Sequence, residues 1–144
     1  MLVSQILKLK PGDGVVTIAP DARVSDAAAL LSSHKIGAVV VSPDGKAVAG
    51  ILSERDIVRR LAAKGAGCLT ETVDAIMTAR IISCTRQETS DEVLAKMTQG
   101  RFRHMPVMDG DEMIGLISIG DVVKAQMQKL SMEKDALESM IKGF

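Results

Sequence analysis

Aromatic residues are the scarcest feature of this 144-residue chain, which contains two Phe and neither Trp nor Tyr. Proteins that bind single-stranded nucleic acid use several aromatic side chains as stacking platforms. The composition therefore argues against that class of function. Aliphatic residues and nine Met must fill the core instead. A bound base would lie between aliphatic side chains, with Phe102 as the only nearby ring.

An excess of either charge is also absent, because Lys plus Arg and Asp plus Glu each number 18. A chain without net charge has no overall basic field that would hold nucleic acid. We therefore expect no nucleic-acid partner. Any anionic ligand must be held by a few local positive groups.

Cysteine and histidine are too few for a metal centre. Cys68 and Cys84 lie 16 positions apart and form no Cys-x-x-Cys motif. We interpret them as small buried apolar residues in a reducing compartment. His34 and His104 lack neighbouring residues at metal-ligand spacing, so we expect no metal site.

Long apolar runs are missing, and the longest, Ile36 to Val41, is interrupted by Gly37. No segment is long enough to cross a bilayer. The first residues lack the charged-then-apolar pattern of a signal peptide, so we expect a cytoplasmic protein with no membrane partner. A hydrophobic fraction of 47% argues against disorder. The length suffices for one compact domain or for two small modules that share a core.

The chain repeats itself. Segments of the first half match the second at an offset of 66, which becomes 65 after one residue is lost in a turn. A short apolar lead-in also recurs, in residues 3–7 and 73–77. The matching pairs are 15–18 with 81–84, 24–28 with 90–94, 37–41 with 103–107, and 50–56 with 115–121.

Each copy predicts the order strand, helix, strand, strand, helix. β-branched runs predict strands over 15–18 and 81–84, and turn residues separate the later strands, predicted over 38–42, 47–52, 104–108 and 112–117. Ser25 and Ser90 stand where helix N-caps are expected, and a second helix is expected to begin at Ser53 or Ser118. This predicts an α/β (α+β) fold of two βαββα repeats related by a pseudo-two-fold axis. We place the first repeat in residues 1–66, the second in 67–130 and a helical extension in 131–144.

The repeated motif Gly-φ-φ-Ser-x-x-Asp, with φ apolar, lies at a strand-to-helix turn in both copies. The first turn of a helix exposes N–H groups and the positive end of the dipole, which favours anions. Asp56 and Asp121 each supply two acceptor oxygens, which match the two donors of a ribose diol. In the alternative interpretation, Ser and Asp only cap the helix. The repetition of the motif favours a ligand role.

The repeated stretches resemble a pair of CBS domains, the module named after cystathionine β-synthase and also called a Bateman module. The resemblance covers about residues 1–127. It is carried by Ile36-Gly37-Ala38-Val39-Val40-Val41, Gly50-Ile51-Leu52-Ser53-Glu54-Arg55-Asp56, Arg103-His104-Met105-Pro106-Val107 and Gly115-Leu116-Ile117-Ser118-Ile119-Gly120-Asp121.

The resemblance implies ligands with an adenosyl group in clefts between the repeats: AMP first, with ADP, ATP, NAD(H) or S-adenosylmethionine as alternatives. It implies that Asp56 and Asp121 hold ribose hydroxyls and that Ser53 and Ser118 lie near ribose or phosphate. Thr17 and Ser83 would border the adenine. Arg103 and His104 would bind phosphate, with Met105 and Pro106 completing that stretch of the site.

The two clefts are not equivalent in sequence. Arg55 precedes Asp56 whereas Gly120 precedes Asp121, and Arg103 and His104 answer two small residues of the first copy. We expect the stronger site to hold Asp121, with Arg103, His104 and Arg55 from the other repeat as phosphate contacts, because an Arg fork suits phosphate. A phosphate contact would make His104 pH-sensitive.

The C-terminal segment from Asp121 to Lys142 contains neither Pro nor Gly and predicts a long helix. Val123, Leu130 and Leu137 recur every seven residues, as do Met127, Lys134 and Ile141, so that Lys134 interrupts the heptad pattern. Such a helix packs on its own module or on a partner. CBS pairs commonly form dimers through such helices, so the resemblance implies a homodimer.

Three functions are compared. The first is a stand-alone sensor that binds adenine nucleotides and regulates an unidentified protein. The second is a structural dimerisation module in which the motif residues only cap helices. The third, an enzyme, is the weakest, because no nucleophile–base pair, metal cluster or phosphate-binding Gly-rich loop is recognisable. We expect no catalytic residues and no catalytic cofactor.

Overall fold

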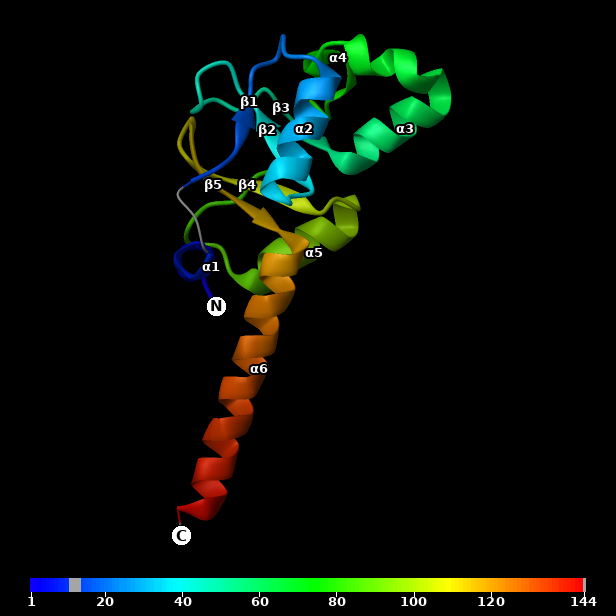
Figure 1. The fold of residues 1–144 in the computed structure, drawn as a ribbon. Coiled ribbons are helices and arrows are strands. Elements are labelled where there is room, and N and C mark those ends of the chain that lie inside the picture. Colours follow the sequence, from blue (N-terminus) through cyan, green and yellow to red (C-terminus); the bar gives the residue numbers. More distant parts are fainter. Residues whose placement is uncertain (11–13, 144) are drawn as a thin grey trace.

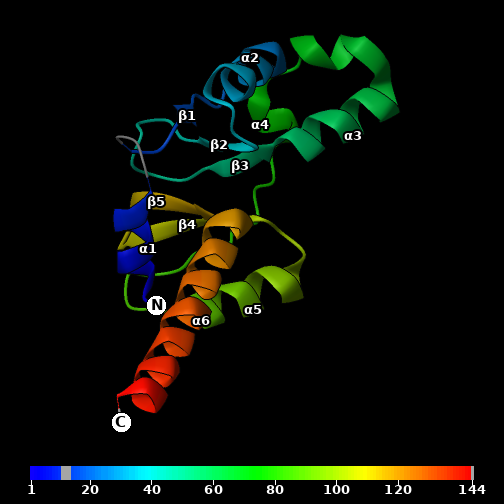
Figure 2. The ribbon, with the colours of Figure 1, turned by 60° about the horizontal axis from the view of Figure 1, so that its bottom comes forward.

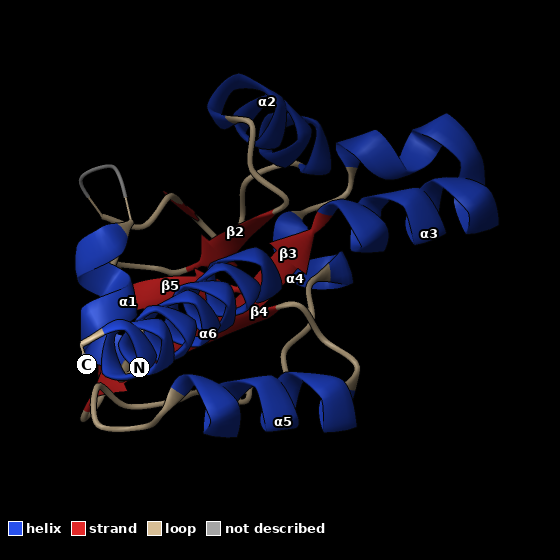
Figure 3. Cartoon of the chain, turned by 90° about the horizontal axis from the view of Figure 1, so that it is seen from below, coloured by secondary structure: helices blue, strands red, loops and turns tan. Residues whose placement is uncertain are grey.

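The two halves of the chain form two small sheets that lie next to each other, with helices on the outer sides (Figure 1). The computed structural model describes residues 1–10 and 14–143. The helix α2 lies outside the first sheet and α5 outside the second (Figure 3). The elements in chain order are α1 (Val3–Leu9), β1 (Thr17–Ile18), α2 (Val24–His34), β2 (Ala38–Val41), β3 (Gly50–Ser53), α3 (Glu54–Lys64), the 3-10 helix η1 (Gly65–Thr70), α4 (Val73–Ile76), α5 (Ser90–Gly100), β4 (His104–Asp109), β5 (Glu112–Ser118) and α6 (Ile119–Lys142).

The strand registers of the two sheets coincide under the sequence offsets. In the first sheet β2 and β3 are antiparallel and pair Ala38 with Ser53. In the second sheet β4 and β5 pair His104 with Ser118, which are the same positions shifted by 66 and 65. The parallel pairing of Ile18 with Val41 recurs as a single bridge between Cys84 and Val107. The predicted doubling of the fold is therefore confirmed at the level of the backbone.

Three of the predicted strands differ from the structure. The strand predicted over 81–84 is wrong, because only Cys84 pairs there and only through one bridge. The strand predicted over 15–18 is reduced to Thr17–Ile18, and the one predicted over 47–52 is Gly50–Ser53. A β-branched run has a high strand propensity, but it forms a strand only where a neighbour supplies a ladder of hydrogen bonds.

The apolar lead-ins are exchanged between the halves (Figure 2). Val3 and Ile6 of α1 are buried in the core of the second half, which is built around Val93 and Ile117. Val73 of α4 is buried in the core of the first half. Each core is therefore completed by a segment that precedes the other repeat in sequence. This exchange ties together two halves that would each be marginal alone.

The glycine that opens each motif lies directly beneath an exchanged lead-in. A Cβ atom at Gly50 would stand 2.8 Å from the carbonyl oxygen of Thr78 and would also meet the Met77 side chain. A Cβ atom at Gly115 would stand 2.7 Å from a methyl group of Leu7. The repeated glycine therefore serves the packing of α1 and α4 on the strands, in addition to any role in the turn.

Two of the four predicted helix caps are correct. The hydroxyl of Ser53 accepts a hydrogen bond from the Asp56 amide, and Ser118 does the same for Asp121. The predicted caps Ser25 and Ser90 are wrong, because both residues lie inside their helices. Thr89 caps α5 instead, one residue earlier. The consequence for Ser90 is a fully buried hydroxyl that has no hydrogen-bond partner among the described residues.

The last helix, α6, extends far beyond the body of the protein (Figure 1). Its first turns are anchored, because Val122 and Ala125 are buried in the second core. Residues 131–143 are all exposed. The long helix predicted at the C-terminus is thus confirmed. No helix of the described part of the chain meets the length and apolarity that a membrane span requires.

Candidate functional site

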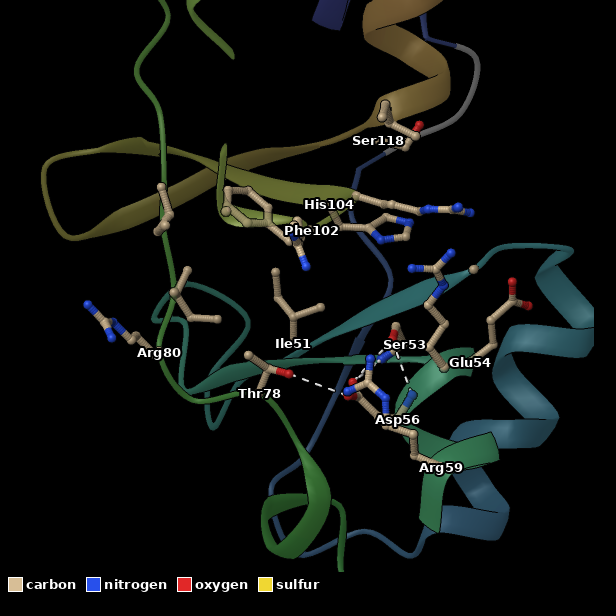
Figure 4. Close-up of a pocket in the computed structure, with 18 residues that line it drawn as sticks. Ile51, Ser53, Glu54, Asp56, Arg59, Thr78, Arg80, Phe102, His104 and Ser118 are labelled. Carbon is tan, nitrogen blue, oxygen red and sulfur yellow. Dashed lines mark hydrogen bonds between the residues drawn. The ribbon is translucent and has the colours of Figure 1, made fainter. Parts of the chain in front are cut away.

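Two cavities lie between the halves of the protein, and each contains one copy of the Ser-x-x-Asp motif. The first, the Asp56 cleft, has a volume of about 690 Å³ and includes Ser53 and Asp56 (Figure 4). The second, the Asp121 cleft, has a volume of about 820 Å³ and includes Ser118 and Asp121. Volumes of this size accommodate a nucleotide-sized molecule.

The residues that line the two clefts are equivalent positions of the two sequence repeats. Ile81 and Ile82 line the Asp56 cleft, and their counterparts Val15 and Val16 line the Asp121 cleft. The stretch 100–104 lines the first and its counterpart 34–38 lines the second. The clefts are therefore one site built twice, and differences between them come from individual side chains.

Asp56 lies at the start of α3 with one carboxylate oxygen engaged in the helix cap. Its Oδ2 accepts hydrogen bonds from the backbone N–H of Ser53 at 2.9 Å and from the Ser53 hydroxyl at 3.1 Å. Its Oδ1 has only a long contact, 3.4 Å, with the hydroxyl of Thr78 (Figure 4). The capping arrangement is thus present, and it leaves the second oxygen of a half-buried carboxylate with spare acceptor capacity.

Cationic side chains gather on the Asp56 cleft. Five arginines from three segments line it, against two carboxylates, Glu54 and Asp56. Within residues 1–10 and 14–143, none of the five forms an ion pair with a carboxylate. Unpaired guanidinium groups beside a helix N-terminus favour a ligand with phosphate oxygens. These arginines are Arg55, Arg59, Arg80, Arg101 and Arg103.

Apolar side chains also line this cleft. Ile51 projects from β3, and Phe102 lies across from it on the second half (Figure 4). Ile81 and Ile82 come from the segment that joins the halves. An apolar surface beside a cluster of cations suits a flat, uncharged ring that carries an anionic group.

The Asp121 cleft has the same carboxylate in a different environment. The backbone N–H of Ser118 donates to Asp121 Oδ2 at 2.9 Å, as in the first copy. The ammonium of Lys10 lies 2.8 Å from the same oxygen and donates to the carbonyl of Leu116. The carboxylate of this cleft is therefore already neutralised by a lysine of the chain itself.

The pKa values in this region follow from burial and from Lys10. Burial acts to raise the pKa of Asp121, but the hydrogen bonds from Lys10 and Ser118 outweigh it, and the pKa is lowered. Burial lowers the pKa of His104, and the nearby Lys10 ammonium lowers it further. His104 is consequently neutral at pH 7.

The structure brings together seven of the eleven residues predicted for the site and leaves four outside. Ser53, Arg55, Asp56, Arg103, His104 and Ser118 line the Asp56 cleft; His104 and Ser118 also line the other cleft, with Asp121. Thr17, Ser83, Met105 and Pro106 line neither cavity. Met105 is fully buried in the second core, where the alternation of β4 directs it away from the cleft.

Of the three cations expected around Asp121, His104 lines its cleft and the two arginines do not. Arg55 and Arg103 line the Asp56 cleft and not the Asp121 cleft. The reason is the crossed arrangement of the halves. Arg103 directly precedes β4, and this end of the strand faces the start of α3 in the first repeat. Residues of the second repeat therefore complete the cleft that contains Asp56.

Sequence reasoning missed Lys10, Arg59, Thr78 and Arg80. Arg59 lies one helical turn after Arg55, so its position could have been found from helical spacing. Arg80 corresponds to Gly14 at the offset of 66. The replacement of a small residue by a cation in the second copy, as at Arg103, was therefore a signal that the repeat offered. Nothing in the sequence marked Lys10, since its contact with Asp121 depends on the exchange of α1.

The described residues contain no group of three or more His, Cys, Asp or Glu that could hold a metal ion. Cys68 and Cys84 are both buried and unbridged, as predicted. Neither cysteine lines a cleft.

Comparison with known proteins agrees with the doubled fold. The family model of the CBS domain matches residues 3–63 and again residues 73–128. A CBS-domain containing protein of Agrobacterium tumefaciens has a crystal structure with a TM-score of 0.83 and 44% identity, over 88% of this chain and 99% of that one. A mitochondrial CBS domain-containing protein of Arabidopsis thaliana is 36% identical over 127 residues, which are 85% of this chain and 62% of the relative.

A third relative was solved with a ligand. The CBS domain protein of Pyrobaculum aerophilum complexed with AMP has a TM-score of 0.73 at 22% identity, over 84% of this chain and 89% of that one. At this level of sequence identity, the similarity is evidence for the fold alone. The two family matches, the strand registers that repeat at the same offsets and the paired clefts agree with one another. The chain belongs to the CBS-domain family, as a tandem pair.

Proposed function

We propose that this protein is a non-catalytic regulatory module that binds an adenine nucleotide, AMP foremost, in the Asp56 cleft. The proposal depends mainly on one observation: this cleft combines a carboxylate with a spare oxygen, five arginines without carboxylate partners and an apolar lining. These three features match the ribose, the phosphate and the base of a nucleotide. ADP, ATP and NAD(H) share these features and are the alternatives.

Each part of the ligand has residues of suitable chemistry. The diol of a ribose can donate to Asp56 Oδ1, beside the Thr78 hydroxyl. The phosphate suits the start of α3 and the guanidinium groups of Arg55 and Arg103. The adenine suits the space between Ile51 and Phe102.

The Asp121 cleft is the weaker candidate. A ligand diol there must compete with the Lys10 ammonium for the carboxylate. Arg55 and Arg103 lie in the other cavity, so the cations left for a phosphate are fewer. We therefore assign the primary site to Asp56, and we expect the second cleft to fill weakly or not at all.

The Pyrobaculum protein shares this fold and is complexed with AMP, which supports an adenosyl ligand for this chain. Regulation follows from the position of the site, because both halves contribute side chains to it. A ligand that binds one relative orientation of the halves more tightly shifts the population toward that orientation. The altered surface is then available to a second copy or to a regulated protein.

The alternative function is a structural dimerisation module without a ligand. One observation favours it: Asp56 and Asp121 both cap their helices, so the motif has a structural role even in an empty protein. The two functions differ in whether the spare oxygen of Asp56 and the five arginines bind a ligand.

Thermal unfolding with AMP, ATP and NADH distinguishes the two functions. A ligand at about 100 times its Kd stabilises the folded protein by about 2.7 kcal/mol. Asp56→Asn retains a cap acceptor but removes the charge, and we expect it to weaken binding about 10- to 150-fold, since a hydrogen bond to a charged group contributes about 1.5–3 kcal/mol.

The matched control is Asp26→Asn. Asp26 caps α2 in the same way, with its Oδ2 3.2 Å from the Arg23 amide, but it lines neither cleft. This variant should bind like the wild type. If no adenosyl compound shifts the unfolding temperature of the wild type, the structural module is the better description.

A further inference from the structure

The Asp121 cleft is lined by side chains whose chemistry differs from that of the Asp56 cleft. We propose that this second cleft is a binding site for a small amphiphilic carboxylate, with the apolar body of the ligand inside the cleft and its carboxylate on the ammonium of Lys35. Such a ligand has neither a diol nor a phosphate. The inference concerns a different cavity from the proposed nucleotide site and does not depend on it.

The lining of the Asp121 cleft is largely apolar. Six large aliphatic side chains face this cavity of about 820 Å³, and all six are half-buried. They come from α1, from the segments that precede β1 and β2, and from β5. A cavity of this kind favours a ligand with an apolar body, because apolar surface of the ligand is removed from water on binding. The six residues are Leu7, Val15, Val16, Ile36, Ile114 and Leu116.

The charged groups of this lining include one cation without a partner. Apart from two histidines, the charged residues are Lys10, Lys35 and Asp121. Lys10 and Asp121 already pair with each other, with 2.8 Å between the ammonium and the carboxylate oxygen. Among the described residues, Lys35 forms no ion pair with a carboxylate. A ligand with a single negative charge would therefore neutralise the cleft.

The type of cation favours a carboxylate over a phosphate. Among the described residues, five arginines and no lysine line the Asp56 cleft, whereas two lysines and no arginine line the Asp121 cleft. The fork of an arginine matches phosphate oxygens, while a lysine ammonium is a compact point charge. A phosphate group carries about −1.5 to −2 charges at pH 7, and Lys35 offers only one positive charge. The two clefts therefore suit different anions.

The backbone of Lys35 supports a role for its side chain. Lys35 ends α2, and Arg101, its equivalent at the offset of 66, ends α5. Both have the left-handed conformation, with φ of 54° and 57°, in which glycine is the usual residue because a side chain costs free energy. Lys35 lines the Asp121 cleft and Arg101 the Asp56 cleft. Each repeat thus has a long cationic side chain at a backbone position that favours glycine, and this side chain can contact a bound anion as well as stabilise the helix end.

Isothermal titration calorimetry of the full chain with octanoate tests the site. We expect one octanoate per chain, with a Kd about fourfold lower for each CH2 group added from hexanoate to octanoate, because each added group is buried. The neutral compound 1-octanol should bind several-fold more weakly than octanoate, since it lacks the charge that Lys35 binds. In NMR spectra, octanoate should shift the amide signals of residues 14–16, 34–38 and 114–116.

Lys35→Gly separates binding from folding. Glycine adopts the left-handed conformation without strain, so this variant should be at least as stable as the wild type and yet bind octanoate at least tenfold more weakly. Lys35→Arg keeps the charge and should retain binding. Lys124→Met, at an exposed lysine that lines neither cleft, is the control. The absence of octanoate binding, equal affinity in Lys35→Gly, or equal affinity for 1-octanol would each overturn the proposal. Competition between octanoate and AMP would do so too, because octanoate would then occupy the Asp56 cleft.

Discussion

The ammonium of Lys10 lies 2.8 Å from Oδ2 of Asp121. At the equivalent oxygen of the other repeat, Asp56 accepts hydrogen bonds only from Ser53. The difference comes from the exchange of the lead-ins. Because α1 packs on the second half and ends beside β5, Lys10 lies next to Asp121 of the second repeat, although it precedes the first repeat in sequence. The two clefts have matching backbones but differ in whether the carboxylate is available to a ligand.

Removal of the Lys10 ammonium should open the second cleft. In Lys10→Met the apolar stem is kept, while Asp121 loses its cation and regains acceptor capacity for a diol. We expect isothermal titration calorimetry with AMP to give about one site per chain for the wild type and about two for Lys10→Met. Lys8→Met, on an exposed position of α1 that lines neither cleft, is the control. Two sites in the wild type would contradict the role given to Lys10.

Stability should fall on acidification because of His104. Its pKa is lowered in the folded protein, first by burial and then by Lys10 and Arg103, while Asp121 and Glu54 act in the opposite direction. The unfolded chain has an ordinary histidine pKa of about 6.5, so below that pH it binds a proton that the folded protein does not. Folding must then release the proton, and the free energy of unfolding decreases from pH 7 toward pH 5.

Urea denaturation of His104→Gln measures this contribution. The variant should show a shallower loss of stability between pH 7 and pH 5 than the wild type. His34→Gln, which replaces an exposed histidine, is the control. Equal slopes for all three proteins would mean that His104 is not the group responsible.

Alanine at the motif glycines should destabilise the two repeats unequally. At Gly50 the added Cβ meets the backbone oxygen of Thr78, which cannot move without shifting the chain. At Gly115 it meets the end of the Leu7 side chain, which can rotate. Overpacking costs about 1–3 kcal/mol. We expect Gly50→Ala in the upper part of that range and Gly115→Ala in the lower part, as measured by chemical denaturation; the reverse order would refute this account of the lead-in packing.

Cys84 should be nearly inert to thiol reagents in the folded protein. Burial raises the pKa of its thiol to about 11. At pH 8 the thiolate fraction is then at least roughly a hundredfold below that of a free cysteine, and the thiolate is the reactive form. Ellman's reagent should therefore modify Cys84 only after denaturation, whereas the exposed thiol of Ser131→Cys reacts at once. Rapid reaction of Cys84 in the native protein would contradict its burial.

Much of the fold was determined by the sequence alone. The offsets of 66 and 65 predicted two equal halves, and the observed registers of β2 with β3 and of β4 with β5 follow them. The caps at Ser53 and Ser118 were also predictable, because a capping box needs only residues three positions apart. Repeats and caps are local patterns, so they can be recognised without knowledge of the tertiary structure.

Tertiary structure alone decided which residues share a cleft. Arg103 lies with Asp56, and Lys10 with Asp121, although both pairs come from opposite repeats. The strand predicted over 81–84 failed for a related reason, since its hydrogen bonds depend on a neighbour that only the fold supplies. Contacts between the repeats depend on the exchange of α1 and α4 between the two cores and on how the two halves pack against each other. That geometry is a property of the packed whole and is not encoded at any single position of the chain.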